Sequence, residues 1–254
     1  MLKTIQLFFA GLFLLMSSFT SGLVSDDFSF NGAWKTQEGT LEQALLFSDG
    51  YFMHTVYDIQ NKQFIQSRGG TYEISGKNLN VKIEFNTHDK EQIGQSLSYI
   101  FAVSKGKSNS DISGKKLSWM MLDKGEGEIA GTWRMSGRKQ DGKITYSPPR
   151  ARKTLKVLTG TRFQWAAINA ETKEFFGTGG GTYTFEKGKY TEKIEFFSRD
   201  NSRVGASLTF DGKLADGNWH HSGLSSTGNP IYEVWSRELK RKSDCQLRIL
   251  ACAD

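Results

Sequence analysis

An acidic residue stands where a β-strand pattern predicts a core side chain. Tyr190 and Ile194 alternate with more polar residues, so every second position of this segment should point inward, and Glu192 falls between them on that side. A buried carboxylate costs several kcal/mol unless it is paired or hydrated. Glu192 therefore indicates a polar interior that could hold a ligand. The alternatives are a carboxylate in solvent at the mouth of the fold, or one paired with an arginine for structure alone.

Aromatic and basic residues on neighbouring segments could complete a pocket around Glu192. Trp165 shares an inward register with Phe163 and Ala167. His221 could reach inward as a hydrogen-bonding group, whereas the adjacent His220 should face the other side of its strand, so the two cannot hold one metal ion. The predicted ligand-binding residues are Trp165, Tyr183, Tyr190, Glu192, Arg162 and His221.

The sequence offers little other chemistry. It has no Gly-x-Ser-x-Gly nucleophile elbow, and its two remaining histidines lie in a distant segment, so we predict neither a metal site nor a cofactor. The glycine-rich run 177–181 joins two strands, whereas a phosphate-binding loop must open a helix. Cys245 and Cys252 are the only cysteines, and they could form a disulfide in an oxidising compartment.

The chain contains an internal duplication, and the candidate pocket belongs to its second copy. Residues 51–98 align without a gap with residues 162–209, and 15 of the 48 positions are identical. Chance would give about three, since typical residue frequencies are ~5–8%. The copies differ in polarity, because Tyr190, Glu192 and Trp165 replace Leu79, Val81 and His54, while Arg162, Arg199 and Arg203 replace Tyr51, His88 and Gln92. We therefore expect a polar second interior and a drier first one.

Each copy is predicted to fold into β-strands. Apolar and polar residues alternate over short runs, and glycine-containing turns such as Asp49-Gly50 recur about every ten residues. A meander of about eight short strands favours an up-and-down barrel, which also removes the exposed edges of the sheet. The predicted fold class is all-β, with two tandem, roughly eight-stranded barrels.

The same alternation assigns side chains to the two faces of each sheet. Leu79, Val81, Ile83 and Phe85 should point inward. The repeated charges Lys82/Lys193 and Glu84/Glu195 are expected on a solvated outer face. The glycine pairs 69–70 and 180–181 are expected to permit a bulge or a sharp bend.

The N-terminal residues have the pattern of a secretory signal. Lys3 precedes about a dozen apolar residues and then small residues, and the apolar run is shorter than the roughly 20 residues that a membrane span needs. We expect cleavage near Gly22 and a periplasmic or extracellular protein with no stable membrane span. The net charge is +6. The short basic runs at 150–153 and 237–242 favour solvated segments over a nucleic-acid-binding surface.

Two tryptophan motifs add a resemblance to a known family. The stretches "GAWKTQ" from Gly32 and "GTWRMSGR" from Gly131 resemble the Gly-x-Trp opening of lipocalin-like, or calycin, barrels. The wider string "GTW…KVLTGTRFQW…GGGTYTF…KYTEKIEF…PIYEVWSR" looks like secreted lipocalin-like proteins of unknown function from Bacteroidetes. The resemblance implies a small-molecule or lipid-binding module. It also implies that each tryptophan plugs the closed end of a barrel, with Arg237 packed against one of them.

The resemblance and the duplication together suggest domain bounds. We expect a signal peptide over 1–22, barrels over 26–126 and 127–238, and a tail over 239–254. Trp133 lies 12 residues further from the shared phenylalanine than Trp34 does, and the insert contains Pro148 and Pro149. Trp133 could therefore close the first barrel instead of opening the second.

Three functions remain open from the sequence. The leading interpretation is a secreted, non-enzymatic binding protein with a small-molecule or lipid pocket in the second barrel. The first alternative is an isomerase or hydrolase on the same scaffold, with Glu192 as the base. The second alternative is a structural or interaction module of an envelope assembly, which predicts filled barrels and a large apolar outer patch.

Overall fold

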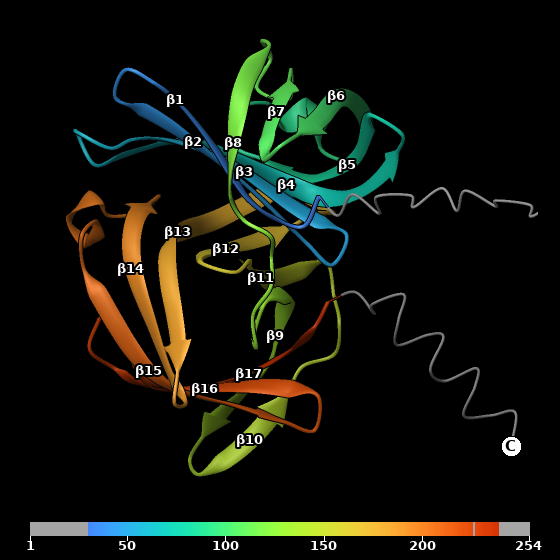
Figure 1. The fold of residues 1–254 in the computed structure, drawn as a ribbon. Helices are drawn as coiled ribbons and strands as arrows, with labels where there is room; N and C mark the ends of the chain where they lie inside the picture. Colours follow the sequence, from blue (N-terminus) through green and yellow to red (C-terminus); the bar gives the residue numbers. More distant parts are fainter. Residues whose placement is uncertain (1–29, 226, 239–254) are drawn as a thin grey trace, which may run out of the picture.

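The computed structural model describes residues 30–225 and 227–238, and these residues form two β-barrels (Figure 1). The prediction of an all-β fold with two tandem eight-stranded barrels is confirmed. The predicted signal peptide, the C-terminal tail, and Cys245 and Cys252 lie outside the described residues. No helix in the described part of the chain is long and apolar enough to cross a membrane.

The first barrel closes when its first and last strands pair. Its strands follow one another in sequence, each antiparallel to the next, and β1 pairs with β8. They are β1 (Gly32–Glu38), β2 (Leu41–Ser48), β3 (Tyr51–Asp58), β4 (Gln63–Ser75), β5 (Asn78–Asn86), β6 (Ser96–Ser104), β7 (Lys107–Ser110) and β8 (Leu117–Asp123), with the short 3-10 helix η1 (Lys90–Gln92) before β6.

The second barrel repeats this meander and adds a hairpin. It is closed by pairing of β9 with β17, so Trp133 opens this barrel and does not close the first one. Its strands are β9 (Gly131–Gln140), β11 (Arg152–Leu158), β12 (Arg162–Asn169), β13 (Glu174–Glu186), β14 (Lys189–Phe197), β15 (Ser207–Ala215), β16 (Asn218–Leu224) and β17 (Pro230–Arg237), with η2 (Asn201–Arg203) before β15. The extra strand β10 (Lys143–Tyr146) pairs only with the end of β9, and it projects beyond the barrel (Figure 1). This hairpin accounts for the longer spacing after Trp133.

The repeated glycines allow a bulge in both copies, as expected. A Cβ atom on Gly70 would lie 1.9 Å from the carbonyl oxygen of Lys82, and one on Gly181 would lie 2.0 Å from that of Lys193. The strand register shifts at both places. The shift inverts the alternation, so Phe85 points out of the barrel and the prediction that it points inward is wrong.

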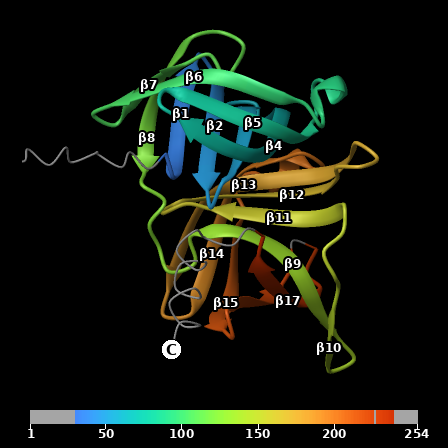
Figure 2. The same cartoon turned by 90° about the vertical axis from the view of Figure 1, so that its right-hand side faces the viewer.

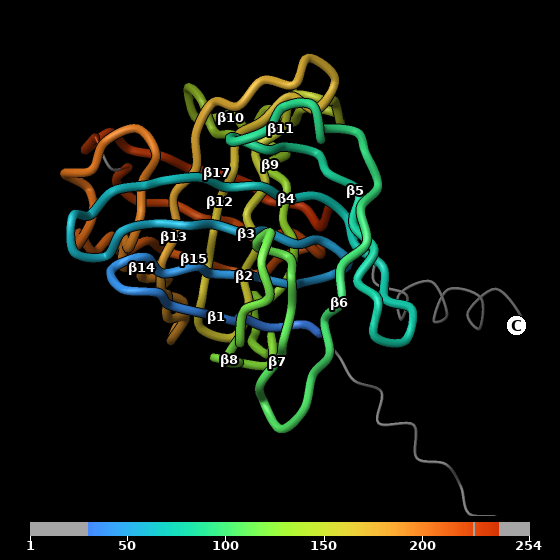
Figure 3. The backbone as a smooth tube through the Cα atoms, turned by 90° about the horizontal axis from the view of Figure 1, so that it is seen from above, coloured from blue at the N-terminus to red at the C-terminus, as the bar shows by residue number. Residues whose placement is uncertain are grey.

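The outward faces of β2 and β3 pack against those of β11 and β12 (Figures 2 and 3). The apolar contact uses residues 111 positions apart from each barrel: Ala44 and Leu155, Leu46 and Val157, Tyr57 and Ile168, Phe64 and Phe175, and Phe85 and Phe196. Gln164 adds a polar contact, since it donates to Ser67 and accepts from Thr55. The interface therefore places equivalent residues from both copies in one shared core.

The repeated glutamates lie beside this interface and not on a solvated face. Glu84 accepts a hydrogen bond from Tyr51 at 2.8 Å and forms an ion pair with Lys153 of the other barrel. Glu195 forms an ion pair with Arg162. Across the interface, Glu195 accepts a hydrogen bond from Tyr57, and Arg162 forms an ion pair with Glu42 of the first barrel. Packing of the barrels covers the outer face that an isolated barrel would expose to water.

The closed end of the second barrel is sealed by Trp133. The Arg237 guanidinium carbon lies 3.9 Å from the centroid of the Trp133 ring. The same arginine donates to the Ala130 carbonyl and to Asp49 of the first barrel. Trp133 is buried behind this arginine and does not line the cavity of the second barrel.

Candidate functional site

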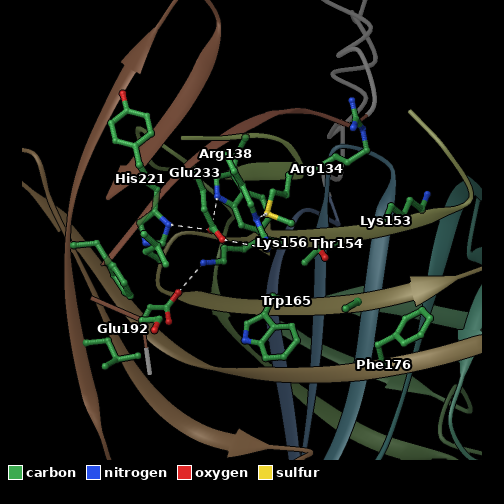
Figure 4. Close-up of a pocket in the computed structure, with 18 of the residues that line it drawn as sticks. Arg134, Arg138, Lys153, Thr154, Lys156, Trp165, Phe176, Glu192, His221 and Glu233 are labelled. Atoms are coloured by element: carbon green, nitrogen blue, oxygen red, sulfur yellow. Dashed lines mark hydrogen bonds and ion pairs between the residues drawn. The ribbon is translucent and has the colours of Figure 1, made fainter. Parts of the chain in front are cut away.

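The second barrel contains a cavity of about 870 Å³ at its open end (Figure 4). Its lining comes from β9, β11–β17, the loop that follows β10 and the segment between β14 and β15 that contains η2. Barrels of this size have interiors that side chains fill or that hold one small ligand. The side chains around this cavity therefore decide what could bind.

A buried ion pair forms the floor of the cavity. Lys156 points inward from β11, and its Nζ lies 2.8 Å from Oε1 of Glu192, which points inward from β14. The side chains are only 5% and 6% exposed. Four aromatic rings surround the Lys156 ammonium, with centroids 5.1–5.8 Å from Nζ: Phe163, Tyr190, Trp219 and Trp235. Ring faces and the carboxylate both stabilise the cation.

A histidine and a second glutamate lie beside this pair. His221 Nδ1 is 3.5 Å from Oε2 of Glu233, and Arg138 reaches the other oxygen of Glu233 at 3.7 Å. Burial lowers the pKa of His221 below its usual value, so the imidazole is neutral near pH 7. Burial opposes ionisation of Glu233, but His221, Lys156 and Arg138 outweigh it and lower its pKa. Glu233 is therefore a carboxylate.

The side walls of the cavity differ in character. Half-buried apolar side chains from β12–β15 form one wall, in which the Trp165 ring meets Phe197 edge-on with centroids 5.5 Å apart beside Leu208. The β9–β11 side is basic. The lining includes seven cations, Arg138, Lys139, Arg150, Arg152, Lys156, Arg199 and Arg203, against Glu192 and Glu233, whereas Arg134 and Lys153 also touch it but form ion pairs with Glu238 and Glu84 outside the cavity. Such a cavity favours an anion that carries an apolar body.

Three of the predicted site residues line this cavity. Trp165, Glu192 and His221 meet around it (Figure 4). Tyr190 is fully buried beneath it, where its ring packs against His221 and belongs to the cage around Lys156. The cavity therefore joins residues from β12, β14 and β16 that are far apart in sequence.

The other two predicted residues lie elsewhere. Tyr183 is at the closed end, where it donates to the Thr159 carbonyl at 2.5 Å, so it does not line the cavity. Arg162 precedes Phe163 on β12, and alternation turns its side chain outward to Glu195 at the contact between the barrels. Neither side chain lines the cavity, contrary to the expectation that both would.

The sequence reasoning missed Lys156 and Glu233. Lys156 aligns with Leu45 when the repeat is extended upstream, and the pairing of Lys156 with Trp133 matches that of Leu45 with Trp34. That comparison would have found the lysine. Glu233 lies beyond the aligned segment, and no comparable signal marks it.

The first barrel has a different interior. Leu45 and Val81, the counterparts of Lys156 and Glu192, are fully or almost fully buried in an apolar core. Near its open end His54 pairs with Gln43, and Arg68 donates to Tyr99 and to the Ile112 carbonyl. What remains is a polar recess of about 500 Å³. The amphipathic cavity is thus a feature of the second copy.

Within the described part of the chain, no three His, Cys, Asp or Glu side chains gather as a metal site would require.

No family model and no curated protein sequence matches this chain. The geometry of the cavity therefore has to carry any functional proposal.

Proposed function

We propose that the protein is an exported binding module that holds a small amphipathic anion in the second barrel. The single observation that carries this proposal is a cavity with an apolar wall, a basic wall and a charged floor. Such a ligand would place its apolar body against Trp165, Phe197 and Leu208. The cations would attract it and compensate its charge.

Comparison of the two barrels supports this function over the alternatives. A structural module predicts two filled barrels, whereas the second barrel contains a cavity of about 870 Å³. A catalytic Glu192 would have to abstract a proton while its carboxylate accepts a hydrogen bond from Lys156 at 2.8 Å. That contact competes with the role of base, so binding is the better proposal.

Titration with anilinonaphthalene sulfonate tests the proposal, because this probe is both apolar and anionic. We expect it to bind with increased fluorescence, and Trp165→Ala should raise Kd at least about tenfold. The charge reversals Arg138→Glu and Arg152→Glu should also weaken binding. Lys189→Glu, at an exposed site that does not line the cavity, is the control and should leave Kd unchanged. Equal binding by all four variants would contradict the proposal.

A further inference from the structure

The first barrel closes without a counterpart of the buried pair Lys156–Glu192. Leu45 occupies the position of Lys156 in the first barrel, across from the equivalent tryptophan, and Val81 occupies the position of Glu192. A buried ion pair often contributes no more stability than apolar residues of similar volume. The pair lines the amphipathic cavity of the second barrel, so we look for its role in what that cavity holds.

The lysine is held in place by more than its partner. The ring centroids within 5.1–5.8 Å of Nζ form a cage that favours a cation whether or not Glu192 is charged. The ammonium has three N–H donors. Among the described residues Glu192 is the one acceptor that it reaches, at 2.8 Å. The site therefore offers a fixed cation with donors to spare and a single, exchangeable anion.

A ligand anion cannot simply join the existing carboxylates. Tyr190, His221 and Lys156 are the titratable groups that face Glu192, and Glu233, which interacts with His221 and Lys156, is already a carboxylate. A third negative charge would leave Lys156 and Arg138 facing three anions in a poorly hydrated floor. Uptake of one proton by Glu192 removes this repulsion and turns that side chain into a hydrogen-bond donor for the incoming group.

We infer that Glu192 is a placeholder for the anionic head of the ligand. A carboxylate enters head-first, its oxygens accept from Lys156, and Glu192 takes one proton from solvent and donates it in a hydrogen bond to the ligand. The apolar body lies along the wall formed by Trp165 and Phe197. The ligand class is an apolar monocarboxylate, and binding is coupled to the uptake of one proton. This inference rests on the proposed function and adds the orientation and the proton.

Calorimetry on the unaltered protein gives the most direct test, with decanoate as the probe. Titrations in buffers of different ionisation enthalpy should report about one proton taken up per decanoate. Between about pH 6 and pH 8 the affinity should fall about tenfold per pH unit, because one proton is bound with the ligand. Burial lowers the pKa of His221 below its usual value, so that ring is neutral in the upper part of this range and does not supply the signal there. A pH-independent affinity without proton uptake would overturn the inference.

Variants then locate the head group. Glu192→Gln should bind decanoate at least about tenfold more tightly near pH 8 and take up no proton, because no carboxylate has to be neutralised. Lys156→Met should weaken decanoate at least about thirtyfold, as expected for a truncated buried charge contact, and leave decanol within about threefold. Glu186→Gln, an exposed glutamate outside the cavity lining, is the matched control and should change nothing. Near-ultraviolet circular dichroism verifies that each variant is folded.

Failure of the inference and failure of the proposed function give different results. If Arg138→Glu abolishes decanoate binding while Lys156→Met does not, the head stays at the mouth; the inference is then wrong and the proposed function stands. If neither decanoate nor anilinonaphthalene sulfonate binds the unaltered protein, both are wrong.

Discussion

Replacing the buried pair of the second barrel by the apolar residues of the first barrel tests whether the pair is needed for the structure. The double variant Lys156→Leu with Glu192→Val recreates the arrangement of Leu45 and Val81. Each side chain of the native pair is at most 6% exposed, so either single change leaves a buried charge without its partner. Such a loss costs about 3–5 kcal/mol in the free energy of unfolding. Glu192→Val should lie at the low end, because four rings still stabilise the ammonium.

The double variant should behave differently from both single variants. Replacing a whole buried pair by apolar residues is about neutral, or stabilises by about 1–4 kcal/mol. A double-mutant cycle should therefore give a coupling energy of at least about 3 kcal/mol. Urea unfolding followed by tryptophan fluorescence measures the free energy of unfolding of the unaltered protein, the two single variants and the double variant. If the double variant is as unstable as the weaker single variant, the barrel needs the pair for its packing, and our reasoning from the first barrel is refuted.

Three further perturbations test the fold. Gly181→Ala should lower stability by at least about 2 kcal/mol, because the new Cβ would lie 2.0 Å from the Lys193 carbonyl oxygen; an unchanged Tm would contradict this. Burial lowers the pKa of His54 from 6.5 to about 3. Between these two pH values the unfolded chain binds a proton at His54 and the native protein does not. Stability should therefore fall with pH below about 6.5, by about 2–3 kcal/mol at pH 4.5, and His54→Gln should flatten this dependence in urea titrations. Arg237→Lys should cost about 1 kcal/mol, because lysine cannot stack its planar group on Trp133, and equal urea midpoints would count against that contact.

The sequence predicted the barrels well because the pattern that identifies each strand is local and occurs in both copies. Alternation with a period of two identifies strands, and the duplication shows that each copy is a complete unit. The alternation failed at Phe85, one residue beyond the bulge opposite Gly70. An extra residue in one strand reverses inside and outside for every later position. The sequence suggested a bulge there, but it did not say on which side of it Phe85 would fall.

The site was predicted in part, and the reason lies in how its strands are buried. Glu192 was visible because one face of β14 alternates cleanly around it. In β11, by contrast, the run from Leu155 to Leu158 is buried throughout, since one face lines the barrel and the other meets the first barrel. A strand with two buried faces shows no alternation. Lys156 therefore could not be assigned inward from its own strand, and only its alignment with Leu45 reveals it.

The two faces of the same strands have diverged to different extents. Leu155 and Val157 point outward and remain apolar, as do their counterparts Ala44 and Leu46, because both copies use this face to join the barrels. Lys156 lies between them and points inward, where its counterpart is a leucine.

Several other departures of the second copy lie at the same cavity, whereas Arg162, which replaces Tyr51, lies at the contact between the barrels. Its longer β9 brings Arg138 and Lys139 to the cavity, and Trp165 supplies part of its apolar wall in place of His54. Substitutions that accumulate independently would scatter over both faces of the strands and both ends of the barrel. These replacements lie on the inward face and around one opening, beside an outward face that stays apolar, and this distribution supports our proposal that the second barrel holds a ligand.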